Sequence, residues 1–187
     1  RRGAAPGSAF RQRRTLMAPD ILFSAEQIRD RVGVLARQIA SAPLRPDIAM
    51  PVLVGGFVFA ADLVRALAWE GVPLDIEMLW LRSYGDKRVA SAISMIAGPS
   101  EQIAGRHVLV IDGVLDAGRT IAKAVSLIQA AGAASVQVAV MLDKQRPDAV
   151  ARADFVGFPI GNDFVIGYGM DDAGKFRGLP YIGKVPA

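Results

Sequence analysis

Hydrophobic positions along the chain follow two periods, which predict alternating helices and strands. Apolar residues spaced three or four positions apart predict helices over 24–40, 57–70 and 120–131. Shorter, mostly apolar runs predict strands in "MPVLVGG" (50–56), "LDIEMLWLRSYG" (74–85), "HVLVID" (107–112) and "SVQVAVMLDK" (135–144). Because strands alternate with helices, we expect right-handed crossovers and an α/β fold whose mostly parallel sheet is flanked by helices on both faces.

Local signals mark where two of these helices begin and end. Ser24 precedes Gln27 by three residues, which is the pattern of a capping box at a helix start. The second predicted helix, 57–70, meets Gly71 and Pro73, and both residues stop helices. The start of the first helix and the end of the second are therefore defined before any tertiary contact is considered.

Composition narrows the class of protein. The 187 residues, 52% of them apolar, suffice for one well-packed domain. Cysteine is absent, which excludes disulfides, thiolate metal sites and thiol nucleophiles and favours a cytoplasmic protein whose metals, if any, have oxygen ligands. No apolar run approaches the roughly 18 residues that span a bilayer, so we expect no contact with a membrane.

The net charge of +4 is concentrated at the start of the chain. The first 14 residues, "RRGAAPGSAFRQRR", hold five of the 22 basic residues and no acidic one, so the rest of the chain is close to neutral. This segment lacks apolar periodicity, and we interpret residues 1–19 as a basic, disordered arm. RNA binding by the arm is the alternative interpretation, and we do not expect the folded body to bind nucleic acid.

The stretch "VLVIDGVLDAGRT" (108–120) joins a predicted strand to a predicted helix. Open parallel sheets bind ligands at the carboxyl ends of their strands, and a loop entering a helix offers unpaired N–H groups to a phosphate. Gly118 and Thr120 suit such a phosphate, whereas Asp112 and Asp116 suit hydroxyl groups, a divalent cation or a proton. The alternative is structural: Asp116 caps the helix and the glycines form the turn.

Four stretches of the chain together resemble one family. The stretch 108–120 resembles the diphosphate-sugar signature of the type I phosphoribosyltransferases. "VGGFVFAADLVRAL" (54–67), "SYG" (83–85) and "FVIGYGMDDAGKFRGLPYIG" (164–183) match loops of its hypoxanthine-guanine branch in the same order. The resemblance implies that family's fold, with a small hood, as a single domain over residues 20–187.

The resemblance also implies a reaction. The 5-phosphoribosyl group of phosphoribosyl diphosphate would pass to N9 of a 6-oxopurine, hypoxanthine or guanine, giving IMP or GMP and pyrophosphate. It implies Mg²⁺ as cofactor and a homo-oligomer, either a dimer or a tetramer.

The implied roles at the central signature are specific. Asp116 matches the general base near purine N7, and Asp112 matches an acid that holds the ribose hydroxyls and contributes to the magnesium site. The 5′-phosphate loop corresponds to Ala117, Gly118, Arg119 and Thr120.

Other implied roles are spread along the chain. Lys144 matches the lysine that recognises the purine 6-oxo group, although a lysine at a strand end can simply be solvated. Phe164 matches the ring that stacks on the base, although it could equally belong to the core, and Val165 matches the adjacent backbone contact. The remaining matches are Asp171 near the magnesium, Arg177 and Gly55 at the pyrophosphate, and Ser83 and Tyr84 in the closing hood.

The chain departs from the family pattern at three positions. Gly113 replaces the second acid of the ribose motif, Ala117 replaces a threonine of the phosphate loop, and Val54 stands where many relatives have lysine. These losses raise a second hypothesis, a weakly active or inactive homologue that binds nucleotides and regulates another process.

Overall fold

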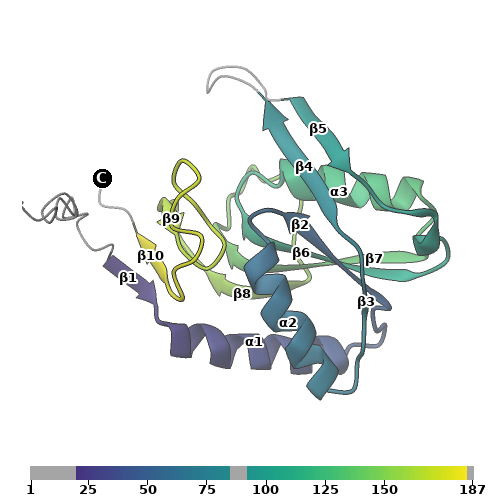
Figure 1. Ribbon diagram of the computed structural model, residues 1–187, viewed down its shortest axis with the longest axis horizontal. Helices are drawn as coiled ribbons and strands as arrows, with labels where there is room; N and C mark the ends of the chain where they lie inside the picture. The colour runs from purple at the N-terminus through teal and green to yellow at the C-terminus, as the bar shows by residue number, and fades with distance from the viewer. Residues whose placement is uncertain (1–19, 85–91, 185–187) are drawn as a thin grey trace, which may run out of the picture.

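The computed structural model describes residues 20–84 and 92–184, so the predicted basic arm lies outside the described residues. Its main sheet has the strand order β5-β4-β2-β6-β7-β8, with β3 pairing with β2 (Figure 1). All pairs in this sheet are parallel except β4 with β5, so the predicted α/β class is confirmed. The strands are β2 (Ile48–Leu53), β3 (Asp75–Ile76), β4 (Leu79–Tyr84), β5 (Ala92–Ala97), β6 (His107–Leu115), β7 (Ser135–Asp143) and β8 (Phe155–Pro159).

Helices cover both faces of this sheet because its central strands are apolar on both sides. Leu109 and Ile111 of β6 pack into a core with α1 (Ala25–Ala40) and α2 (Phe57–Trp69). The alternate residues Val108 and Val110 pack into a second core with α3 (Arg119–Ala130) on the opposite face. The carboxyl end of β6 lies between these two cores, and the candidate site is located at this end.

The start of α1 forms as predicted. Ser24 Oγ accepts a hydrogen bond from Gln27 N at 3.2 Å, and Gln27 Oε1 accepts one from Ser24 N at 2.8 Å. The capping box therefore satisfies two N–H groups that have no partner within the helix.

A second, antiparallel sheet joins the two ends of the described chain. It consists of β1 (Asp20–Phe23), β10 (Ile182–Lys184) and β9 (Val165–Ile166), and Figure 1 shows it beside the carboxyl end of the main sheet. The long loop between β9 and β10 carries Asp171 and Arg177. These strands are only two to four residues long, too short to produce a clear hydrophobic period.

Two sequence predictions need correction. The single strand predicted over 74–85 is divided into β3 and β4, because β3 pairs with Ile48 and Ala49 of β2 whereas β4 pairs further along, with Val52 and Leu53. Residues 92–97, for which no element was predicted, form β5 and pair with β4. In the part of the chain that the structure describes, no helix is long and apolar enough to cross a membrane.

Candidate active site

Two adjoining hollows lie at the carboxyl ends of the central strands. The first, here called the Asp112 hollow, has a volume of about 620 Å³ and is lined by residues that include Gly55, Arg82, Asp112, Thr120, Asp171 and Arg177. The second, the Asp116 hollow, has about 400 Å³ and is lined by Ile93, residues 116–121 and Arg146. Thr120 lines both, so one extended ligand can occupy the two hollows together.

The turn between β6 and α3 requires glycine at position 118. Gly118 has a φ of +75°, and a Cβ there would lie 2.7 Å from Ala151 N. Both the backbone conformation and the space therefore exclude other residues. The turn is held by the bond from Val150 N to Ala117 O at 3.0 Å.

The N-terminus of α3 is open toward the Asp116 hollow. The helix's first backbone bond runs from Ala122 N to Gly118 O at 2.9 Å, and Gly118 supplies no side-chain cap. The N–H groups of the first turn thus point outward with the positive end of the helix dipole. Asp116 does not cap the helix, so the structural alternative for this residue is wrong.

Asp116 instead binds two cations. Its Oδ2 lies 2.9 Å from Lys144 Nζ and its Oδ1 lies 3.0 Å from Arg146 Nη1. Burial by itself raises the pKa of Asp116, but Lys144 and Arg146 outweigh it and lower the pKa below its usual value. The Lys144 side chain is 11% exposed, so it is part of the site rather than a solvated strand end.

Asp112 has a contrasting environment. Its Oδ1 accepts a hydrogen bond from Gly113 N at 2.7 Å, and no ion pair reaches it within the described residues. Burial raises the pKa of Asp112 to about 7, and the bond from Gly113 N opposes this only partly. The free carboxyl is thus half-protonated near neutral pH.

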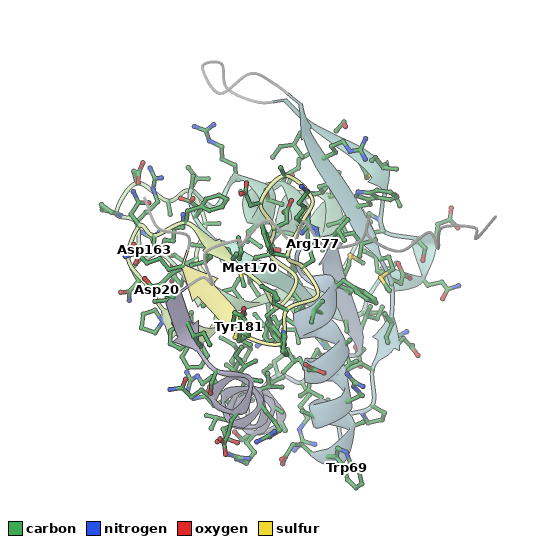
Figure 2. The ribbon with its side chains drawn as sticks, turned by 60° about the vertical axis from the view of Figure 1, so that its left-hand side comes forward. Asp20, Trp69, Asp163, Met170, Arg177 and Tyr181 are labelled. Atoms are coloured by element: carbon green, nitrogen blue, oxygen red, sulfur yellow. The ribbon has the colours of Figure 1, made fainter. Side chains whose placement is uncertain are left out.

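Arg177 and Asp171 reach the Asp112 hollow from the loop between β9 and β10. Arg177 Nη2 lies 2.7 Å from Asp171 Oδ1, and Arg177 Nη1 donates to Gly169 O at 2.6 Å. Figure 2 shows Arg177 and Met170 on this loop, beside α2. A Cβ on Gly55 would lie 3.9 Å from both Arg177 Nη1 and Asp112 Oδ1, so Gly55 separates the two groups.

Gly113 packs beneath the same glycine. A Cβ on Gly113 would lie 3.1 Å from Gly55 O and 3.6 Å from Met170 Cγ. Gly113 has no positive φ. An acid at this position is therefore compatible with the backbone but must press on the carbonyl of the Gly55 loop.

The remaining candidates occupy different parts of the fold. Ser83 and Tyr84 end β4, where their backbones pair with Ile93 and Ala92. Phe164 precedes β9 and is 54% exposed, so it is not a core residue, whereas Val165 is buried and pairs with Lys184.

Sequence reasoning missed Arg146. Besides Asp116, it binds both oxygens of Asp148, with Nε at 3.0 Å and Nη2 at 2.8 Å. Its position two residues after Lys144 was the available signal, but a lone arginine in a polar loop carries no periodicity.

Comparison with known proteins defines the class. Residues 20–173 match the family model of the phosphoribosyl transferase domain. The chain belongs to the phosphoribosyltransferase family, and its relatives assign it to the hypoxanthine and hypoxanthine-guanine branch. It is 34% identical over 166 residues to the hypoxanthine-guanine phosphoribosyltransferase of Bacillus subtilis, covering 87% of this chain and 91% of the relative. The hypoxanthine phosphoribosyltransferase of Haemophilus influenzae is 33% identical over 172 residues, 89% of this chain and 94% of the relative.

A longer relative and a solved structure add to this result. The chain is 35% identical to the bifunctional protein TilS/HprT of Listeria innocua over 87% of its own length, but spans only 25% of that protein. The hypoxanthine phosphoribosyltransferase of Trypanosoma cruzi, solved with the product IMP, superposes with a TM-score of 0.80 at 35% identity, over 89% of this chain and 93% of that one.

Proposed function

We propose that the protein transfers the 5-phosphoribosyl group from phosphoribosyl diphosphate to hypoxanthine or guanine, as an enzyme of purine salvage. The observation that carries this proposal is the pairing of Asp116 with Lys144 next to the open N-terminus of α3. A proton acceptor, a donor for an oxo group and a phosphate cradle then adjoin one another, as a nucleoside monophosphate product requires.

Lys144 and Asp116 divide the work on the purine. Lys144 donates to the 6-oxo oxygen, which favours oxopurines over adenine, while Phe164 stacks on the ring and the Val165 backbone contacts its edge. As N9 bonds to C1 of the ribose and the bond from C1 to the diphosphate breaks, the N7 proton passes to Asp116. When Lys144 turns to the purine, Asp116 loses a cation and its affinity for the proton increases.

The sugar phosphate extends from this point through both hollows. The 5′-phosphate binds the N–H groups of residues 117–120 and the Thr120 hydroxyl, and Asp112 accepts bonds from the ribose hydroxyls. The leaving pyrophosphate binds Gly55 and Arg177, whose forked guanidinium suits it. Ser83 and Tyr84 belong to the segment that closes over the site and excludes water.

Magnesium fits the Asp112 hollow only together with substrate. Among residues 20–84 and 92–184, no three acidic or histidine side chains are grouped to hold a metal. Asp112 and Asp171 nevertheless line the same hollow, and Mg²⁺ is commonly held by one or two carboxylates plus substrate phosphates and water. Bound there, the ion would neutralise charge on the diphosphate.

A homo-oligomer is supported by the outer face of α2. Phe57 is 48% exposed and Trp69 is 91% exposed, and Figure 2 shows Trp69 projecting from the helix end. Ile76 and Met78 are also exposed and line one hollow together with Phe57. Exposed apolar surface of this kind often marks a protein–protein interface, so we propose that a second copy packs on this face.

One assay tests the proposed function. The purified protein is mixed with Mg²⁺, phosphoribosyl diphosphate and each purine base, and the release of pyrophosphate is measured. Release with hypoxanthine or guanine, unchanged by deletion of residues 1–19, supports an enzyme whose single domain spans 20–187. Nucleotide binding without pyrophosphate release supports the regulatory homologue instead, as the replacements Gly113 and Ala117 suggest.

A further inference from the structure

Arg146 lies at the Asp116 hollow without a role in the reaction proposed above. It lines this hollow together with residues 116–121, which form the phosphate loop and the first turn of α3. Its side chain is 36% exposed, so a ligand in the hollow can reach it. The question is what chemistry a guanidinium supplies there.

Asp148 fixes the orientation of the Arg146 guanidinium. Asp148 accepts two parallel bonds from Nε and Nη2, the fork geometry that holds an arginine plane most firmly. A third N–H binds Asp116 Oδ1 at 3.0 Å. A guanidinium has five N–H groups, so beyond the bonds within the described chain two remain for a ligand.

Charge gives the second argument. The Asp116 carboxylate lines the same hollow as the α3 N-terminus and repels a phosphate bound there. Arg146 and Lys144 together offset this carboxylate, and Arg146 brings N–H donors to the place where the phosphate must lie. The loop also has Ala117, which offers no hydroxyl donor, so the hollow needs a donor from elsewhere.

We propose that Arg146, oriented by Asp148, is a further substrate-binding residue that donates to the 5′-phosphate of phosphoribosyl diphosphate and of the nucleotide product. This inference rests on the proposed function, because it assigns the Asp116 hollow to that phosphate. It makes Asp148 a positioning residue that touches no substrate.

The test compares two ligands by calorimetric titration. IMP and ribose 5-phosphate share the phosphate, but only IMP carries a purine. Arg146→Gln should weaken the binding of both by the same factor, about tenfold to a hundredfold, as expected for a lost bond between charged groups. Arg146→Lys and Asp148→Asn keep the cation without its fixed fork and should give smaller losses for both ligands.

Lys123→Gln is the control, because it removes one positive charge from an exposed position on α3. It should leave both affinities within about twofold. Weakening of IMP alone would mean that Arg146 acts only through Asp116 on the purine, and unchanged binding of both ligands would also overturn the inference. Wild-type protein that binds neither ligand and releases no pyrophosphate would instead refute the proposed function.

Discussion

Asp112 and Asp116 lie four residues apart at the same end of β6, yet their surroundings shift their pKa values in opposite directions. Asp116 is 44% exposed and paired with Lys144 and Arg146, which lower its pKa. Asp112 is half-buried beside Gly113, and desolvation of its carboxyl raises its pKa to about 7. Asp116 is therefore ionised before a ligand binds. Asp112 needs a bound ligand to stabilise its negative charge.

This difference separates the two ends of the proposed reaction. At the purine end, the substrate must draw cations away from Asp116 before it can accept a proton. At the sugar end, hydroxyl groups or Mg²⁺ must bring the partner that Asp112 lacks.

The largest effect is expected from Asp116→Asn. The amide keeps the shape of the carboxylate but cannot accept the proton, so kcat with hypoxanthine should fall about 100-fold or more. Asp154→Asn, which changes a carboxylate bonded to Val138 N at 2.7 Å, is the matched control and should retain kcat within about twofold. Steady-state kinetics decide, and an unchanged kcat for Asp116→Asn would remove the base from the mechanism.

Lys144→Ala tests the role of Lys144 in binding the purine and in lowering the pKa of Asp116. It should cost about 1.5 to 3 kcal/mol of transition-state binding, measured as kcat/KM for hypoxanthine. It should also raise the pKa of Asp116 toward its usual value, seen as a higher acid limb in the pH profile of kcat/KM. Wild-type protein that uses adenine as well as hypoxanthine would contradict the role of Lys144.

Asp112→Asn tests the raised pKa of Asp112, through the pH dependence of the free energy of unfolding. The folded pKa of about 7 exceeds the usual 3.8, so the native state binds the proton more tightly and stability falls as pH rises between these values. At pH 8 the amide should increase the free energy of unfolding by about 2 kcal/mol. This value is half of the free energy that corresponds to the full pKa shift, because water in the hollow screens the carboxylate. Urea denaturation at pH 8 and pH 4 measures it.

At pH 4 the substitution should change stability little. An equal effect at both pH values would show that the carboxyl is not held protonated by burial. The wild-type affinity for phosphoribosyl diphosphate should also increase from pH 6 to pH 8.

Gly113→Asp has the smallest expected effect. A second acid should strengthen ribose binding, but its Cβ presses on Gly55 O at 3.1 Å, so the gain should be below the tenfold that a free carboxylate would give. Gly113→Ala introduces the contact without the acid and is the matched control. If calorimetry gives the same affinity for phosphoribosyl diphosphate in both variants, Gly113 does not face the ribose.

Long elements with strong periodicity were predictable from the sequence. The capping box at Ser24 and the buried strand beginning at His107 have local causes, so their patterns identified them. The short strands β9 and β10 could not be predicted, because they depend on pairing with each other and with the distant β1. Likewise β5 depends on pairing with β4 rather than on its own alternation.

The candidate site was predicted through motifs rather than through contacts. Asp112, Asp116 and Lys144 were found because they lie near the carboxyl ends of predicted strands. The opposite electrostatic environments of the two aspartates depend on packing that no motif encodes. Arg146 was missed for the same reason, since it matters through its distance to Asp116 across 30 positions of sequence.

The ion pairs of the two hollows, before ligand binds, also determine which solutes bind there only weakly. Arg177 is bound to Asp171, and Lys144 and Arg146 share Asp116, so these cations already have partners. Without breaking a pair, a simple anion such as chloride or sulfate can reach, among the described residues, only the N-terminus of α3 and the two remaining N–H groups of Arg146. A nucleotide precursor replaces several pairs at once, so the hollows stay receptive in a cell crowded with inorganic anions.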